Sequence, residues 1–116
     1  MWLFTKYGFF SIVQDRNDSR RVLVRARIRN DLERLLHLLD DKCDGEAPEV
    51  VEMPDADYAF RIFLDKAAWA KVAKVLANDI DYGNFKNAVH GEPDRDQAYM
   101  EVWSSLSRLQ EDRLSQ

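Results

Sequence analysis

The stretch Val22-Leu23-Val24-Arg25-Ala26-Arg27-Ile28-Arg29 decides the fold. Small or branched apolar side chains alternate along it with mainly basic ones. A period of two is typical of a β-strand with one buried face. The sequence therefore predicts a strand with two unlike faces. The apolar face would hold Val22, Val24, Ala26 and Ile28, and the opposite face would hold Leu23, Arg25, Arg27 and Arg29.

A helix is predicted directly after this strand, at about residues 31–40. Asn30 is a favourable N-cap, and Glu33 three residues later completes an approximate capping box. Leucines then recur at helical spacing at positions 32, 35, 36 and 39. Before the strand, β-prone residues 2–5 and 9–14 flank a bend that contains Gly8, and residues 15–19 form a turn by composition.

The order strand, turn, strand, helix occurs twice, at residues 9–40 and 49–78. The second copy has a short strand near 49–53, a turn at Pro54, an alternating strand that ends at Leu64, and a helix over about 66–78. We therefore predict one α+β domain over residues 1–116, built on an antiparallel sheet of four or five strands from two β-β-α units. The first two helices would cover one face through apolar strand residues that match at an offset of 36. These are Val22, Val24, Ala26 and Ile28 in the first unit, and Tyr58, Phe60, Ile62 and Leu64 in the second.

The last forty residues are predicted to be helical. A short helix precedes a break at residues 91–93, and a final helix spans about 95–111, with Asp94 and Gln97 as its N-cap pair. Its apolar stripe consists of Tyr99, Val102, Trp103, Leu106 and Leu109. We expect this stripe to form a two-fold dimer interface or to meet another protein partner. The alternative is that it packs on the first strand, Trp2 to Phe4, within one chain.

Composition and charge narrow the class of protein. The chain has 116 residues, 46% hydrophobic and 33% charged, which is a globular composition. The net charge is −4, but residues 1–39 hold eight Lys or Arg against four Asp or Glu. No apolar run approaches the ~20 residues of a membrane span, and no secretory signal pattern is present. Cys43 is the only cysteine, so no internal disulfide is expected, and we predict a cytoplasmic location.

Three arginines are the candidates for binding an anion: Arg25, Arg27 and Arg61. Arg25 and Arg27 share one face of their strand, and Arg61 matches Arg25 in the second β-β-α unit. Arginine binds phosphate in a bidentate manner, and neighbouring aromatic rings can stack on bases, which makes a nucleic acid a candidate ligand. Against this, the RNP aromatic motif is absent and the chain is acidic overall. The alternative interpretation is that acidic residues of the C-terminal half pair with these arginines.

A second, polar cluster comprises Asp81, Tyr82, Asn84, Lys86 and His90. His90 would serve as a general base if a carboxylate oriented it, which is the basis of a small-hydrolase hypothesis. The alternative is an aspartate helix cap and an exposed histidine near a helix C-terminus. Two histidines and one cysteine, far apart in sequence, give no metal-ligand spacing. We therefore predict no catalytic residue, no metal and no cofactor.

Four segments carry a resemblance to known sequences. The chain opens Trp2-Leu3-Phe4-Thr5-Lys6-Tyr7-Gly8-Phe9-Phe10-Ser11. It later contains Val24-Arg25-Ala26-Arg27, Ile80-Asp81-Tyr82-Gly83-Asn84-Phe85-Lys86-Asn87-Ala88-Val89 and Val102-Trp103-Ser104. Together these segments resemble a family of short bacterial proteins of unknown function. The resemblance implies a bacterial, cytoplasmic, single-domain protein, and it implies no chemistry. From the residues themselves we predict a non-enzymatic binding or protein-interaction module. The alternatives are an anion or nucleic-acid binder and, third, the hydrolase.

Overall fold

The computed structural model describes residues 1–42, 48–89 and 91–116. These residues divide into two compact units, Met1–Ile80 and Asp81–Gln116, each of which is described by itself. Cys43 and His90 lie outside the described residues. No helix in the described ranges has the length and apolar character needed to cross a membrane.

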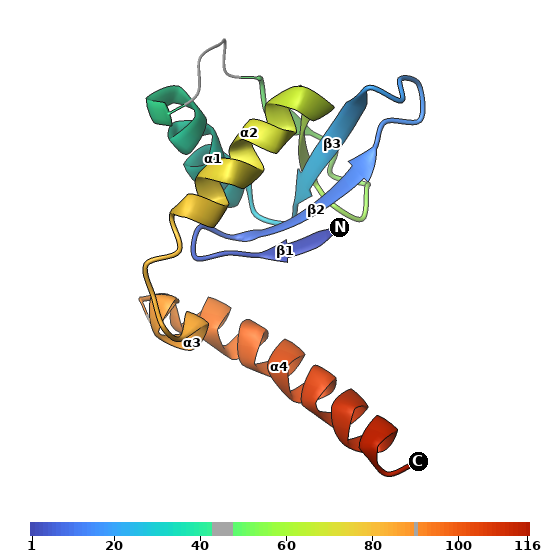
Figure 1. Ribbon diagram of the computed structural model, residues 1–116. Helices are drawn as coiled ribbons and strands as arrows, with labels where there is room; N and C mark the ends of the chain where they lie inside the picture. Colours follow the sequence, from blue (N-terminus) through green and yellow to red (C-terminus); the bar gives the residue numbers. More distant parts are fainter. Residues whose placement is uncertain (43–47, 90) are drawn as a thin grey trace. The chain divides into compact units, whose positions relative to one another are not determined.

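The first unit alternates strands and helices (Figure 1). Its elements, in chain order, are β1 (Trp2–Phe4), β2 (Phe9–Gln14), β3 (Arg21–Ala26), α1 (Arg29–Lys42), β4 (Val51–Glu52), β5 (Phe60–Asp65) and α2 (Lys66–Asn78). The described strands form one five-stranded sheet in the order β1-β2-β3-β5-β4, and each neighbouring pair is antiparallel. The predicted α+β fold is thus confirmed, with β2-β3-α1 and β4-β5-α2 as its two β-β-α units.

The core lies between the sheet and the two helices, which pack on one sheet face. Alternate residues of β2, β3 and β5 point into it, among them the fully buried Phe10, Val24 and Ile62. From α1 the core receives Leu32 and Leu35. This burial is the main source of stability for the unit, because each fully buried aliphatic or aromatic side chain contributes about 1.5–3 kcal/mol.

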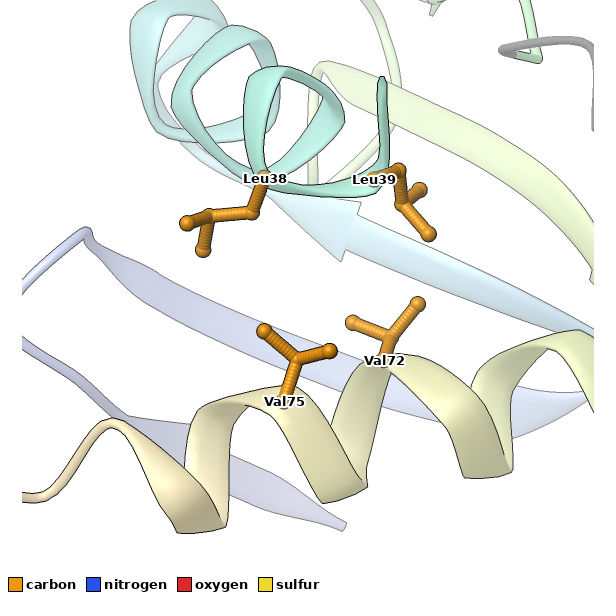
Figure 2. Close-up of a pocket in the computed structure, with 4 residues that line it drawn as sticks. All are labelled: Leu38, Leu39, Val72 and Val75. Atoms are coloured by element: carbon orange, nitrogen blue, oxygen red, sulfur yellow. The ribbon is translucent and has the colours of Figure 1, made fainter. Parts of the chain in front are cut away.

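The two helices also contact each other. Figure 2 shows Leu38 and Leu39 of α1 pointing towards Val72 and Val75 of α2. The gap between these four side chains is apolar and has no room for a water molecule. It is therefore an imperfection of packing and not a ligand site.

Two residues expected on the helix-covered face lie elsewhere. β3 ends at Ala26, so Ile28 falls in the bend before α1 and remains 48% exposed. The prediction extended the alternation too far because α1 begins at Arg29 and interrupts the strand. Tyr58 is buried, but it precedes β5 and lies outside the core cluster, and its ring is stacked on the guanidinium groups of Arg25 and Arg27. A bend at residues 56–58 breaks the period of two before the strand starts.

The turn between β1 and β2 explains the polar residues of the opening motif. The Thr5 hydroxyl donates to the Gly8 carbonyl oxygen and accepts from the backbone N–H groups of Tyr7 and Gly8. The Asp31 carboxylate, 2% exposed, accepts from the Phe9 N–H and lies against Gly8, where a Cβ atom would overlap it. Gly8 is therefore required by close approach.

The second unit contains two helices, α3 (Phe85–Ala88) and α4 (Pro93–Leu114). α4 begins two residues earlier than predicted, with Glu92 and not Asp94 as its N-cap residue, because Pro93 suits the first helical position. The Arg95 side chain, 8% exposed, donates to Glu92 Oε2 at 3.0 Å and to the Tyr99 hydroxyl at 3.2 Å. Arg95 and the stacked rings of Phe85 and Tyr99 hold this unit together.

Candidate anion-binding face

The face of the sheet opposite α1 and α2 carries no described helix of its own unit (Figure 1). One row of directly paired residues crosses all five strands on this face. In strand order the row reads Trp2, Ser11, Arg25, Arg61 and Val51. Directly paired residues of antiparallel strands project to the same side, so these five side chains form one continuous stripe.

Arg25 and Arg61 are direct cross-strand partners, an arrangement in which two like charges repel. Arg25 Nη2 donates to Ser11 Oγ at 2.7 Å, and Arg61 Nη2 donates to the Tyr58 carbonyl oxygen at 3.1 Å. The Nε–H of each arginine is buried without an acceptor. Neither guanidinium has a carboxylate at salt-bridge distance within the described part of the chain. The pair therefore holds two uncompensated positive charges.

Tyr58 anchors the arginines of this face. Its ring centroid lies 4.6 Å from Cζ of Arg25 and 4.4 Å from Cζ of Arg27. Arg27 Nη1 also donates to the backbone carbonyl and to Oδ1 of Asp57. Stacking of a guanidinium on an aromatic ring restricts the long side chain without neutralising it. Tyr58 thus orients two of the predicted anion-binding arginines, Arg25 and Arg27, without neutralising either.

The other arginines near this face have acidic partners. Arg21 lies 3.7 Å from Asp15 and stacks on Phe63, and Arg27 lies 3.3 Å from Asp57. Arg27 thus has an acidic partner, as the alternative interpretation expected, and this acid lies in the loop before β5. Because Arg25 and Arg61 have no such partner in the ranges that the structure describes, the unpaired positive charge of the face is concentrated on the central pair.

Aromatic rings adjoin the arginine pair. Phe9 stacks on Phe4 at a centroid distance of 4.6 Å, meets Trp2 edge-on at 6.0 Å and lies 6.4 Å from Tyr58. Trp2 is 70% exposed. The β-propensity of residues 2–5 and 9–14 predicted strands here but not the face of the sheet on which these rings lie. Alternation along residues 2–4 could have revealed the face of these rings. Of the three residues, only Leu3 packs against the core cluster, so Trp2 and Phe4 point to the opposite face.

The second predicted cluster has structural roles where it is described. The Asn84 side chain caps α3 by accepting from the Lys86 N–H at 2.9 Å, and the Tyr82 ring packs on Phe85. Asp81 and Lys86 lie in the same segment, but His90 is outside the described residues, so the proposed base has no described geometry. The cap is an asparagine, and not an aspartate as the alternative interpretation supposed.

The interface candidates of α4 divide into two groups. Tyr99 is stacked on Phe85 and accepts from Arg95, so it serves the second unit itself. Val102 is half-buried, whereas Trp103 is 63% exposed and Leu106 is 58% exposed. The exposed stripe continues through Leu109 at 48%.

Comparison with known proteins gives no function for this sheet face. No protein-family model, curated protein or solved structure matches the chain. Among the described residues, no group of three or more His, Cys, Asp or Glu side chains is placed to hold a metal ion. The physical chemistry of the sheet face is therefore the basis of the functional argument.

Proposed function

We propose that this protein is a non-enzymatic binding module that recognises an anionic group through Arg25 and Arg61. The observation that carries the proposal is their direct cross-strand pairing without a carboxylate in the described structure. A phosphate or carboxylate that bridges the two guanidinium groups relieves their repulsion and supplies charge-assisted hydrogen bonds. Arg27, held on the same Tyr58 ring, adds to the attraction from one side.

The surroundings of the pair support recognition of a ligand. Ser11, 1% exposed, fixes one guanidinium, and the Tyr58 carbonyl oxygen fixes the other. Side chains that are already ordered lose less conformational entropy when they bind. In the second predicted cluster, by contrast, the Asn84 side chain is used to cap α3.

Calorimetric titration with inorganic pyrophosphate at low ionic strength tests the proposal. We expect saturable binding that is lost in the double variant Arg25→Ala with Arg61→Ala. The matched control is Arg16→Ala with Arg20→Ala, because both exposed arginines lie in the β2–β3 turn and their removal also costs two positive charges. Equal binding by the double variant and the control would contradict the proposal.

A second proposal concerns self-association, which the exposed α4 stripe favours. Trp103 and Leu109 lie three residues before and after Leu106, and all three are exposed. An antiparallel pair of α4 helices centred on Leu106 would place Trp103 of one copy over Leu109 of the other. The stripe is thus self-complementary under two-fold symmetry, as an isologous dimer requires. The self-association and the sheet-face site involve separate units and stand independently.

The setting we propose for this module is the bacterial cytoplasm. The chain has a single cysteine, which cannot form an internal disulfide, and this composition suits a reducing compartment. The resemblance to short bacterial proteins supports the same setting. Measuring the oxidation state of the thiol in freshly lysed cells tests it, and a stable intermolecular disulfide would argue against it.

A further inference from the structure

We infer that the anionic ligand of the Arg25–Arg61 pair is single-stranded nucleic acid, which crosses the strands of the sheet and stacks a base on Trp2. This inference rests on the proposed anion-binding function and specifies its ligand. It depends on two features of one stripe: an uncompensated pair of guanidinium groups, and an exposed indole ring two strands away.

Trp2 and Arg25 are close enough for one short ligand segment to reach both. Ser11 separates Trp2 from Arg25 in the cross-strand row, so the two residues are two strands apart. Neighbouring strands lie about 4.8 Å apart, which puts the two positions roughly 10 Å from each other across the sheet. A short flexible segment of nucleic acid can span this separation with one base on the ring and a backbone phosphate on the arginines. A free phosphate would use only the arginine end of the stripe.

The Trp2 ring is both supported by its neighbours and exposed. Trp2 meets Phe9 edge-on, and Phe9 is in turn stacked on Phe4, so the indole is supported on one side. Trp2 as a whole is nevertheless 70% exposed. A supported but uncovered ring is suited to stack on a base, because every base has a π-face and stacking tolerates any sequence.

The positive charge that could attract nucleic acid is local to the Arg25–Arg61 pair. The chain is acidic as a whole, at −4, and this opposes nonspecific attraction to nucleic acid. Asp15 and Asp57 pair with Arg21 and Arg27, and Asp65 lies directly opposite Arg21 in the β3–β5 ladder. Arg25 and Arg61 have no carboxylate partner among the described residues. Local attraction is thus confined to a small site. This predicts modest affinity and a shallow salt dependence, with about two phosphate contacts.

An acidic peptide is the competing macromolecular ligand. Its carboxylates would satisfy the arginine pair, but its backbone would not account for a supported, exposed indole in the same stripe. Stacking on Trp2 therefore separates the two ligands, and the peptide becomes an outcome of the test.

The experiment compares three probes by fluorescence anisotropy with the full chain at low salt: an eight-nucleotide oligouridine, the matching oligothymidine, and an oligoglutamate peptide of equal charge. All three carry the same dye. Unlabelled polyphosphate, which has the charges but no bases, serves as a competitor. We expect both oligonucleotides to bind more tightly than the peptide, and polyphosphate to compete only weakly.

Trp2→Ala separates stacking from charge. We expect it to weaken oligonucleotide binding by about 5- to 150-fold, which corresponds to the loss of one base–aromatic stack. Pyrophosphate binding should be unchanged, and Trp2→Phe should restore most of the loss. Leu114→Ala, which removes an exposed apolar side chain at the end of α4 and outside the proposed α4 stripe, is the control and should retain oligonucleotide affinity.

The outcomes keep this inference distinct from the proposed function. If pyrophosphate binding depends on Arg25 and Arg61 but Trp2→Ala leaves oligonucleotide affinity unchanged, the anion site stands and the nucleic-acid inference is overturned. Tighter binding of the oligoglutamate peptide would overturn it in favour of a protein ligand. If neither pyrophosphate nor any labelled probe binds, both proposals fail.

Discussion

Arg25 and Arg61 face each other directly across the β3–β5 ladder, one fixed by Ser11 and the other by the Tyr58 carbonyl oxygen. Opposed like charges at the centre of a sheet lower its stability, and evolution of stability alone would place an acid at one of the two positions. A loss of stability from unfavourable side-chain pairing is typical of functional sites, where residues are retained because they bind a ligand. The following predictions separate the contributions of this pair from those of the surrounding fold.

Replacing one arginine with an acid should stabilise the fold and abolish the site. Arg61→Glu would set opposite charges across the ladder, so we expect the free energy of unfolding to rise by about 0.2–1 kcal/mol. Pyrophosphate binding should fall below detection in the same variant. Urea denaturation followed by circular dichroism measures the first effect and calorimetry the second. Arg61→Gln controls for loss of the charge alone, and a clear drop in stability for Arg61→Glu would mean that the pair is structural.

Leu64→Ala and Ile28→Ala should differ sharply, although the repeat matched their positions in the two β-β-α units. Leu64 is 8% exposed and belongs to the core cluster, so its truncation should cost about 2–5 kcal/mol. Ile28 is 48% exposed, and its truncation should change stability by no more than about 0.5 kcal/mol. Denaturant midpoints of the two variants check this. Equal losses would show that β3 extends through Ile28.

Gly8→Ala should destabilise the first unit, because its new Cβ would overlap the Asp31 carboxylate. Forcing an extra methyl group into a close-packed site costs about 1–3 kcal/mol. Thermal unfolding measures the loss. Combining Gly8→Ala with Asp31→Gly should cost less than the sum of the two single changes, since the overlapping Cβ, Cγ and Oδ2 atoms of Asp31 are then absent. Strict additivity would place the effect in the backbone of Gly8 and not in the contact.

The exposed apolar stripe of α4 should determine the oligomeric state of the protein in solution. At micromolar concentration, light scattering should report a dimer of the 13.6 kDa chain. Trp103→Asp should shift it to the monomer, because a charge would have to be buried at the two-fold contact. Ser104→Asp changes a neighbouring residue and serves as the control. A monomeric mass for the unchanged protein would exclude the interface.

The sequence by itself determined most of the secondary structure. β2 at Phe9–Gln14 and α2 at Lys66–Asn78 have the predicted bounds, because alternation and helical spacing are local signals carried by many residues at once. The two β-β-α units likewise followed from element order. The matching of Arg25 with Arg61 was visible as a repeat offset of 36, and the ladder register turned that offset into direct opposition.

The tertiary structure alone decided how the sheet face is composed. Tyr58 has the parity of a core residue, but a bend before β5 turns its ring to the arginine side, where it stacks on Arg25 and Arg27. Trp2 joins the same stripe because β1 pairs with β2 in a register that places it opposite Ser11. Register depends on contacts between segments distant in sequence, so the period of two within a strand reveals alternating faces but not which side chains meet across the ladder.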